Sequence, residues 1–197
     1  LVERFGVEQG QPHFYRVLDA AWRVAGKGSL GLERYVILVE GKGSPRGNYL
    51  LDLKRAAPSA LPVARGRGAV RWPSEARRVV TTQRLAQAIA PALLHAVSLG
   101  GRSFVLKELQ PMIDRLDLST WDGRIDRLES VVDSMSAVTA WAHLRTCYRH
   151  GACTPEELQR YVARAHWQRA LPALAVRCSE RALDQWSAFS RAYDSGT

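Results

Sequence analysis

The chain has 197 residues, of which 46% are hydrophobic, so it can bury the core of one domain or of two small ones. Its formal net charge of +9 favours anionic partners such as nucleotide phosphates, nucleic acid or acidic lipid. No apolar run reaches the roughly 18 residues that a membrane helix needs, which argues against a membrane protein. Three cysteines are too few for a disulfide framework, so we expect the cytoplasm as the compartment.

Arginine supplies most of the positive charge. Of the 28 basic residues, four are lysines, namely Lys27, Lys42, Lys54 and Lys107. The arginines are scattered along the chain, which is typical of a coding bias rather than of one polyanion-binding block. In such a chain, a retained lysine indicates a place where a compact ammonium on a flexible stem is needed.

Residues 1–17 are polar, contain glycine and show no clear period, so we expect a connector. The chain begins Leu-Val-Glu-Arg rather than with Met and a basic segment, and no signal peptide is visible. We therefore expect the connector to follow a missing N-terminal part of a longer protein.

Three strands are predicted over residues 19–25, 33–40 and 49–54. The first ends at Gly26-Lys27-Gly28-Ser29-Leu30-Gly31, which fits the pattern G-x-G-x-x-G. A dinucleotide-binding loop of this pattern opens a helix, whereas here a β-branched and aromatic run follows and indicates a strand. A glycine loop between two strands, followed by a lysine such as Lys54 on the third strand, is the phosphate clamp of protein-kinase-like folds. The later Gly41-Lys42-Gly43-Ser44-Pro45 lacks the first glycine of a Walker A motif and is predicted to be a turn.

A helix is predicted after an irregular crossing between residues 58 and 73. Ser74 can cap this helix, Glu75 suits its N-terminal dipole, and an apolar period continues to Ile89. Two apolar runs, 93–99 and 103–110, flank Gly100-Gly101 and predict a β-hairpin. Residues 18–111 are thus predicted to form an antiparallel five-stranded sheet with one helix.

From about residue 122 a period of 3.6 residues dominates and predicts helices. The first is a long amphipathic helix that ends near Gly151, and Thr154-Pro155-Glu156-Glu157 has the composition of a second helix start. Pro172 is expected to divide a further helical stretch that runs to Tyr193. The predicted fold class is α+β, with a sheet-containing domain at 18–111 and a mostly helical domain at 112–197.

The candidate site follows from the chemistry of phosphate binding. Glycines let main-chain N–H groups approach phosphate oxygens without an intervening Cβ, and a lysine neutralises the phosphates. A side chain on the following helix would orient this lysine. Either Glu75 or Gln83 fits that role, although a first-turn Glu75 is equally explained by capping. The backbone at Glu108 would meet an adenine ring, while Lys107-Glu108 also reads as a pair of solvated charges. The predicted nucleotide-binding residues are Gly26, Lys27, Gly28, Ser29, Gly31, Lys54, Glu75, Gln83 and Glu108.

A second pattern, H-x3-C-x2-H-x2-C, is formed by His143, Cys147, His150 and Cys153. The first three share one helical face, as ligands of a zinc ion would. The spacing matches none of the familiar closed zinc sites, and packing or surface roles explain these residues as well. The sequence therefore predicts no metal site and no catalytic residue.

Four segments in order resemble those of a known family. They are residues 24–35 around the glycine loop, Tyr49-Leu50-Leu51-Asp52-Leu53-Lys54, Arg78-Val79-Val80 with Gln83-Arg84-Leu85, and Phe104-Val105-Leu106-Lys107-Glu108-Leu109. Over about residues 18–195 the chain resembles the DUF2252 family, a bacterial family of unknown function related to the protein-kinase-like superfamily. The resemblance implies a kinase N-lobe-like sheet, ATP with Mg²⁺ as the ligand, and phosphoryl transfer to an unknown acceptor.

The chain departs from the family pattern in several places. Arg55 and Arg77 stand where members commonly have an acid. The family's G-D-x-H-x-x-N stretch, which resembles a kinase catalytic loop, and an acidic metal-binding segment normally precede the glycine loop, and this chain contains neither. The chain therefore looks like the C-terminal portion of a member, and alone we expect it to bind ATP weakly or not at all and to catalyse no phosphoryl transfer. The alternative is a non-catalytic interaction module whose basic surface binds nucleic acid or a partner protein.

Overall fold

A computed structural model describes residues 1–26, 31–59, 71–111, 116–150, 153–164 and 166–196. The chain divides into two compact units, Leu1–Arg149 and His150–Thr197. None of the described helices combines the length and hydropathy that crossing a lipid bilayer requires.

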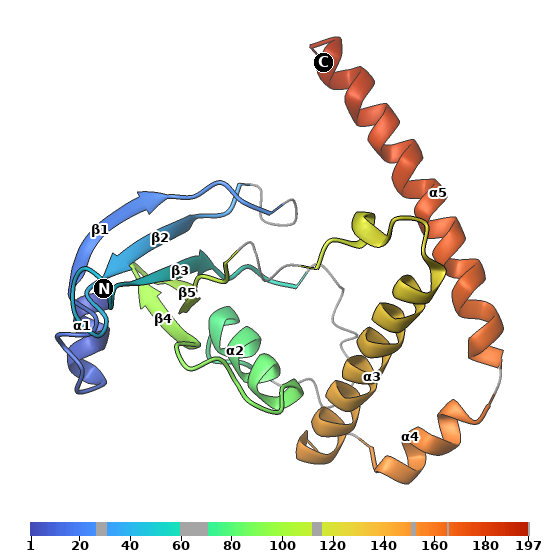
Figure 1. Cartoon of the computed structure of the whole chain (residues 1–197), viewed down its shortest axis with the longest axis horizontal. Helices are drawn as coiled ribbons and strands as arrows, with labels where there is room; N and C mark the ends of the chain where they lie inside the picture. The colour runs from blue at the N-terminus through green and yellow to red at the C-terminus, as the bar shows by residue number, and fades with distance from the viewer. Residues whose placement is uncertain (27–30, 60–70, 112–115, 151–152, 165, 197) are drawn as a thin grey trace. The chain divides into compact units, whose positions relative to one another are not determined.

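The first unit is built on a five-stranded antiparallel sheet, drawn from blue to yellow-green in Figure 1. Its strands are β1 (Val17–Trp22), β2 (Arg34–Val39), β3 (Tyr49–Arg55), β4 (His95–Leu99) and β5 (Arg102–Glu108). Their order across the sheet is β1-β2-β3-β5-β4. The predicted five strands and the hairpin at Gly100-Gly101 are therefore confirmed, with ends that shift by a few residues.

Four helical segments accompany the sheet in this part of the chain. They are α1 (Val2–Glu8), α2 (Glu75–Ala86), the 3-10 turn η3 (Leu118–Trp121) and the long helix α3 (Ile125–His150). The helix predicted from Ser74 is α2, and the Ser74 side chain caps it by accepting from the backbone N–H of Arg77 at 3.2 Å. The α+β class is confirmed.

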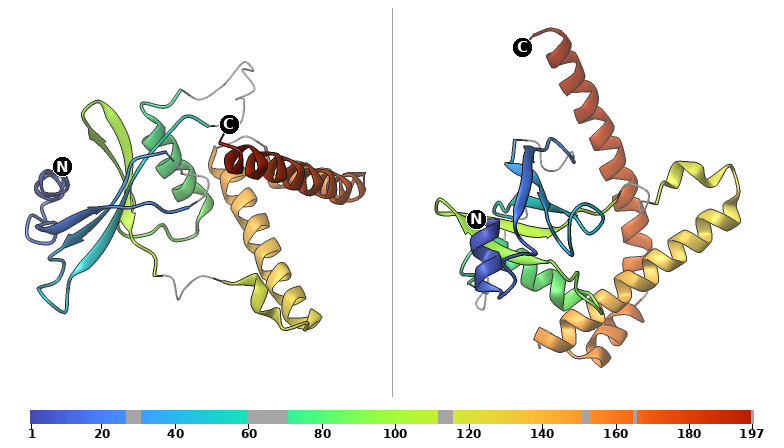
Figure 2. Two further views of the ribbon diagram at one scale, coloured as in Figure 1. Left: turned by 90° about the horizontal axis from the view of Figure 1, so that it is seen from above. Right: turned by 60° about the vertical axis from the view of Figure 1, so that its left-hand side comes forward.

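The sheet has a packed core on each face. On the first face, α1 contributes Val2 and Phe5 to a cluster that also includes Leu51, Leu53 and Phe104. On the second face, Ala76 and Val80 of α2 pack against Leu94 and Val105. The left view of Figure 2 shows α1 and α2 on opposite sides of the sheet. Because side chains alternate along a strand, Asp52 and Lys54 belong to the second face.

The segment expected to be a connector, residues 1–17, takes part in the fold. Residues 2–8 form α1, and Val2, Phe5 and Tyr15 are buried in the first core. A seven-residue helix shows only two turns of periodicity, which is too short a pattern to recognise in the sequence. The first core therefore depends on this N-terminal segment.

Both ends of α2 are held to their surroundings. At the start, Ala76 N–H donates to Ser103 Oγ at 3.3 Å, and Arg78 donates to the carbonyl of Ala57 at 3.2 Å. At the end, Arg84 donates to the carbonyl of Leu94. Arg149 of α3 donates to the carbonyl of Leu85 at 3.3 Å, which satisfies a carbonyl of the last helical turn.

The second unit contains α4 (Pro155–Val162) and α5 (His166–Asp194). The predicted start of α4 is confirmed, because Thr154 and Glu157 form a reciprocal capping box. The prediction that Pro172 divides the last helical stretch is wrong, because α5 continues through it. Pro172 lies only six residues after the start of α5, so its missing backbone donor and the crowding of the preceding turn affect the first two turns and leave the long remainder of the helix intact.

Candidate functional site

The glycine-rich segment connects β1 to β2. Gly26 and Gly31, at its described ends, have φ of +80° and +78°, a region that residues with a Cβ rarely adopt. A Cβ at Gly31 would meet no atom within 4 Å, so backbone conformation rather than crowding favours glycine there. The predicted site residues Lys27, Gly28 and Ser29 lie outside the described residues.

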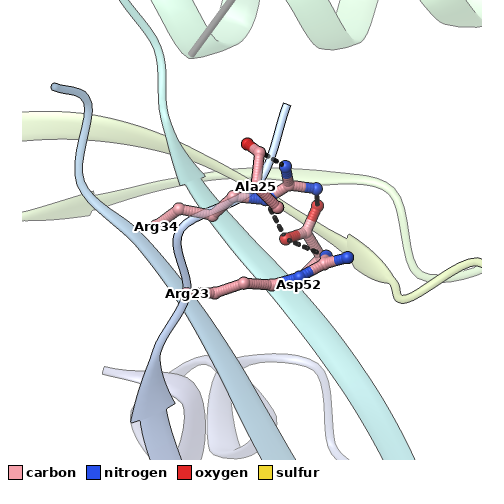
Figure 3. Close-up of polar contacts among 4 residues, drawn as sticks. All are labelled: Arg23, Ala25, Arg34 and Asp52. Atoms are coloured by element: carbon pink, nitrogen blue, oxygen red, sulfur yellow. Dashed lines mark hydrogen bonds and ion pairs between the residues drawn. The ribbon is translucent and has the colours of Figure 1, made fainter. Parts of the chain in front are cut away.

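A buried carboxylate lies beside this segment. The Asp52 side chain is 1% exposed, and it accepts from Arg34 Nε at 2.6 Å and from Arg34 Nη2 at 2.7 Å. Arg23 Nη1 approaches Asp52 Oδ1 at the longer distance of 3.4 Å. Figure 3 shows both arginines converging on this carboxylate. A paired carboxylate of this kind satisfies the hydrogen-bonding needs of a charge that burial would otherwise penalise.

Lys54 lies next to this pair on the second face of the sheet. It is the cross-strand neighbour of Arg34 on β2 and of Val105 on β5. Burial lowers the pKa of Lys54 below 10.5, and the positive charges of Arg34 and Lys107 lower it further, against the attraction of Asp52. The protonated amine of Lys54 is therefore under-compensated by its surroundings.

Asp52 lies two residues before Lys54 on β3, and its cross-strand neighbour on β5 is Lys107. We call Arg23, Arg34, Lys54 and Lys107 the cationic cluster. Two of its positive side chains, those of Arg23 and Arg34, pair with the single carboxylate of Asp52, and the two lysines lie at neighbouring strand positions, so positive charge is left over on this part of the sheet. The cationic cluster can attract an anion by charge and can offer it guanidinium and ammonium donors.

The predicted partners of Lys54 lie on α2. Glu75 Oε2 accepts from Arg78 Nε at 2.7 Å, so this carboxylate is already paired within its own helix. Gln83 is half-buried two turns later, on the same stripe as Glu75 and Val79, and Val79 packs on the second core. Within the described part of the chain, no ion pair joins Lys54 to a carboxylate within 4.0 Å. The role of Glu75 or Gln83 as an orienting partner stays a prediction.

Glu108 lies apart from the cationic cluster. It ends β5 as the cross-strand neighbour of Leu51, on the first face of the sheet, and its side chain is exposed. Lys54 and Glu108 thus point to opposite faces. The predicted contact between the backbone at Glu108 and an adenine ring stays a prediction.

Sequence reasoning missed Arg23, Arg34 and Asp52. One signal was present in the sequence. Asp52 is a charged residue inside the apolar run Leu50-Leu51-Asp52-Leu53, and an aspartate is rarely buried in a strand unless it is paired. Its partners come from β1 and β2, and finding them required the register between strands. A single sequence does not supply that register.

A hollow of about 710 Å³ borders the edge strand β4 and shares no residue with the cationic cluster. Its lining includes Arg4, Arg77, Arg84 and His95. Burial lowers the pKa of His95, and the nearby charge of Arg84 lowers it further. Glu8 also lines the hollow and pairs with Arg4, so its excess positive charge comes from Arg77 and Arg84.

The cysteine and histidine pattern near residue 147 forms no described metal site. Cys147 and Cys153 are disulfide-bonded, and Cys178 is free and exposed. In the part of the chain that the structure describes, no group of three or more His, Cys, Asp or Glu residues could hold a metal ion. The disulfide differs from the expectation based on the cysteine count.

A family model described as "Uncharacterized protein conserved in bacteria (DUF2252)" matches residues 3–192. No curated protein and no solved structure matches the chain. The matched range includes nearly all of α1, the whole sheet and all but the last two residues of α5. The chain therefore belongs to the DUF2252 family of uncharacterised bacterial proteins.

Proposed function

We propose that the second face of the sheet binds the phosphates of ATP with Mg²⁺, and that this chain is the nucleotide-binding half of a kinase-like phosphotransferase. The observation that carries the proposal is the cationic cluster, which lies beside a glycine-rich segment and leaves positive charge around one carboxylate. Phosphate oxygens accept from ammonium and guanidinium donors, which the cationic cluster offers, and from backbone N–H donors, which the glycine-rich segment would add.

The state of Lys54 supports the proposal. Its lowered pKa means that the protonated form is less stable in the ligand-free protein than in an unperturbed lysine. A polyphosphate next to the amine would reverse this effect, because an opposite charge within about 4–6 Å stabilises the protonated form. Binding would therefore relieve an unfavourable interaction that already exists in the free protein.

The order of the elements also supports a kinase-like role. Protein kinases place a glycine-rich loop over the phosphates, a lysine on the third strand and an orienting carboxylate on the following helix. Here the glycine-rich segment joins β1 to β2, Lys54 lies on β3, and α2 follows and packs on the same face. In this arrangement Glu75 or Gln83 is the side chain that would orient Lys54.

The proposal assigns no catalytic residue to this chain. Phosphoryl transfer in kinases needs an Asp that accepts the acceptor's proton and an Asp/Asn pair that holds Mg²⁺. In the DUF2252 resemblance these belong to the G-D-x-H-x-x-N stretch and to the acidic segment after it. We propose that another part of the full-length protein supplies both, so that this chain binds nucleotide without transferring its phosphate.

The direct test is ATP binding in the presence of Mg²⁺, measured by calorimetry, with Lys54→Ala and Lys42→Ala compared. Both variants remove one lysine, but Lys42 is exposed in the turn between β2 and β3. We expect Lys54→Ala to weaken binding about tenfold or more, the usual effect of losing a hydrogen bond to a charged group. Equal affinities for the two variants would refute the proposal.

The second candidate function is polyanion binding by an interaction module, which the arginine-lined hollow beside β4 favours. Counterion release makes such binding fall steeply with salt. We would measure a single-stranded oligonucleotide at two salt concentrations with Arg77→Ala and Lys54→Ala. Loss of affinity in Arg77→Ala alone supports this second function, and loss in Lys54→Ala alone favours the nucleotide site.

A further inference from the structure

The cationic cluster contains one side chain that works against anion binding. Asp52 is fully buried, and its negative charge would repel a phosphate bound at Lys54. A site selected for anion affinity alone would gain from a neutral residue there. The presence of Asp52 therefore calls for a function other than electrostatic attraction.

The hydrogen bonds of Arg34 indicate that function. Two of its nitrogens engage both oxygens of Asp52, and the third, Nη1, donates to the carbonyl of Ala25 at 3.0 Å. A guanidinium held on both sides in this way has a fixed orientation and little capacity left for a ligand. Figure 3 shows it between the carboxylate and Ala25.

Ala25 is the residue before Gly26, at the point where the strand ladder has ended. The last backbone hydrogen bond between the two strands runs from Arg23 N–H to the Arg34 carbonyl, at 2.8 Å. Beyond this backbone hydrogen bond, the next contact comes from the Arg34 side chain, which donates to the Ala25 carbonyl. Asp52 on β3 in turn holds Arg34, so the start of the glycine-rich segment is tied to the strand that carries Lys54.

We infer that Arg34 and Asp52 are a positioning pair, which sets the start of the glycine-rich segment against β3 and on which nucleotide affinity depends. The identity of the ligand in this inference rests on the proposed function. The positioning of the segment by Arg34 and Asp52 is a property of the ligand-free protein. Pre-organisation of this kind strengthens binding because less of the binding free energy is used to order the segment.

The sign of one substitution separates positioning from electrostatics. Asp52→Asn removes a negative charge, so a site that works by charge alone should bind ATP with Mg²⁺ more tightly. If Asp52 positions the segment, affinity falls about tenfold, the effect of a lost charge-assisted hydrogen bond. Asp19→Asn is the matched control, since it makes the same change at an exposed position on β1.

A second variant tests whether a loss of ATP affinity comes from unfolding of the protein rather than from loss of positioning. Replacing a buried ion pair by apolar residues of similar size is often neutral for stability. We therefore expect Arg34→Met with Asp52→Leu to keep the midpoint of thermal unfolding near that of the unmodified chain. The double variant still lacks the contact to Ala25, so its ATP affinity should also fall about tenfold.

Amide hydrogen exchange provides a readout that needs no ligand. In the double variant, exchange at the Arg23 amide, which makes the last hydrogen bond of the β1–β2 ladder, should accelerate several-fold or more, while exchange at Ile37 and Leu51 stays unchanged. Unchanged exchange at the Arg23 amide, or ATP affinity in Asp52→Asn equal to or higher than in Asp19→Asn, would overturn the inference. If Lys54→Ala leaves ATP binding unaffected, the proposed ligand is wrong, and the exchange rates alone decide on the positioning pair.

Discussion

The N-terminal helix offers a quantitative test of the fold, because its contribution to the core was not expected from the sequence. Phe5 is 8% exposed in α1 and packs against Tyr15 and His95, with ring centroids 5.2 Å and 4.7 Å away. Phe5→Ala would remove this aromatic ring and leave a cavity on the first face of the sheet. Substitutions of buried phenylalanines by alanine cost about 3–5 kcal/mol.

The matched control is Val7→Ala on the same helix, where the valine is 66% exposed. Alanine has the higher helix propensity at both positions, by roughly 0.5 kcal/mol, so this gain is common to the two variants. The expected difference between them is therefore about 3 kcal/mol, against a total stability of roughly 5–15 kcal/mol for a domain of ordinary size.

Urea denaturation followed by far-ultraviolet circular dichroism would measure this difference. Phe5→Ala should unfold at a clearly lower urea concentration with an unchanged slope, since the surface exposed on unfolding is nearly the same. Val7→Ala should remain within about 0.5 kcal/mol of the unmodified chain. If both variants unfolded at the same urea concentration, α1 would not belong to the cooperative core.

Three further predictions concern single residues. Ser74→Ala should lower the free energy of unfolding by about 1 kcal/mol, because it removes the cap of α2, as measured by urea denaturation. Lys54→Met should raise the unfolding midpoint slightly at neutral pH, although we expect it to weaken the proposed ATP binding. The sign follows from the lowered pKa of Lys54: its protonated form destabilises the fold below that pKa, and the penalty fades as pH rises to the unfolded value of 10.5. The midpoint gain of Lys54→Met should therefore shrink between these two pKa values, and a gain that grows with pH would contradict the reasoning. Arg102→Ala should destabilise the protein by no more than about 1 kcal/mol in the same assay, because its ion pair with Glu33 Oε1 at 2.6 Å is solvent-exposed.

The sheet could be predicted because its signals are local. Gly100-Gly101 between two apolar runs specifies a hairpin, and Ser74 before an apolar period specifies a helix start. These features depend on neighbouring residues alone. A single sequence is enough to find them.

The buried pair of Arg34 and Asp52 could not be predicted, because it depends on contacts between distant segments. The period of β3 assigns Leu51 and Leu53 to one face and Asp52 to the other, but it does not say which face is covered. Both faces are covered, one with α1 and the other with α2. With Asp52 on an inner face, only the register with β2 reveals that Arg34 neutralises it.

The fixed ends of α2 limit how this protein could be regulated. Its first turn is attached to β5 through Ser103, and its last carbonyls are bound by arginines of α3. A helix held at both ends has no free end about which to swing, so switching by rigid displacement of α2 would require breaking several hydrogen bonds at once. Any adjustment of the distance between Lys54 and α2 therefore falls to side-chain rotamers, which change within nanoseconds when exposed, rather than to a slow helix movement.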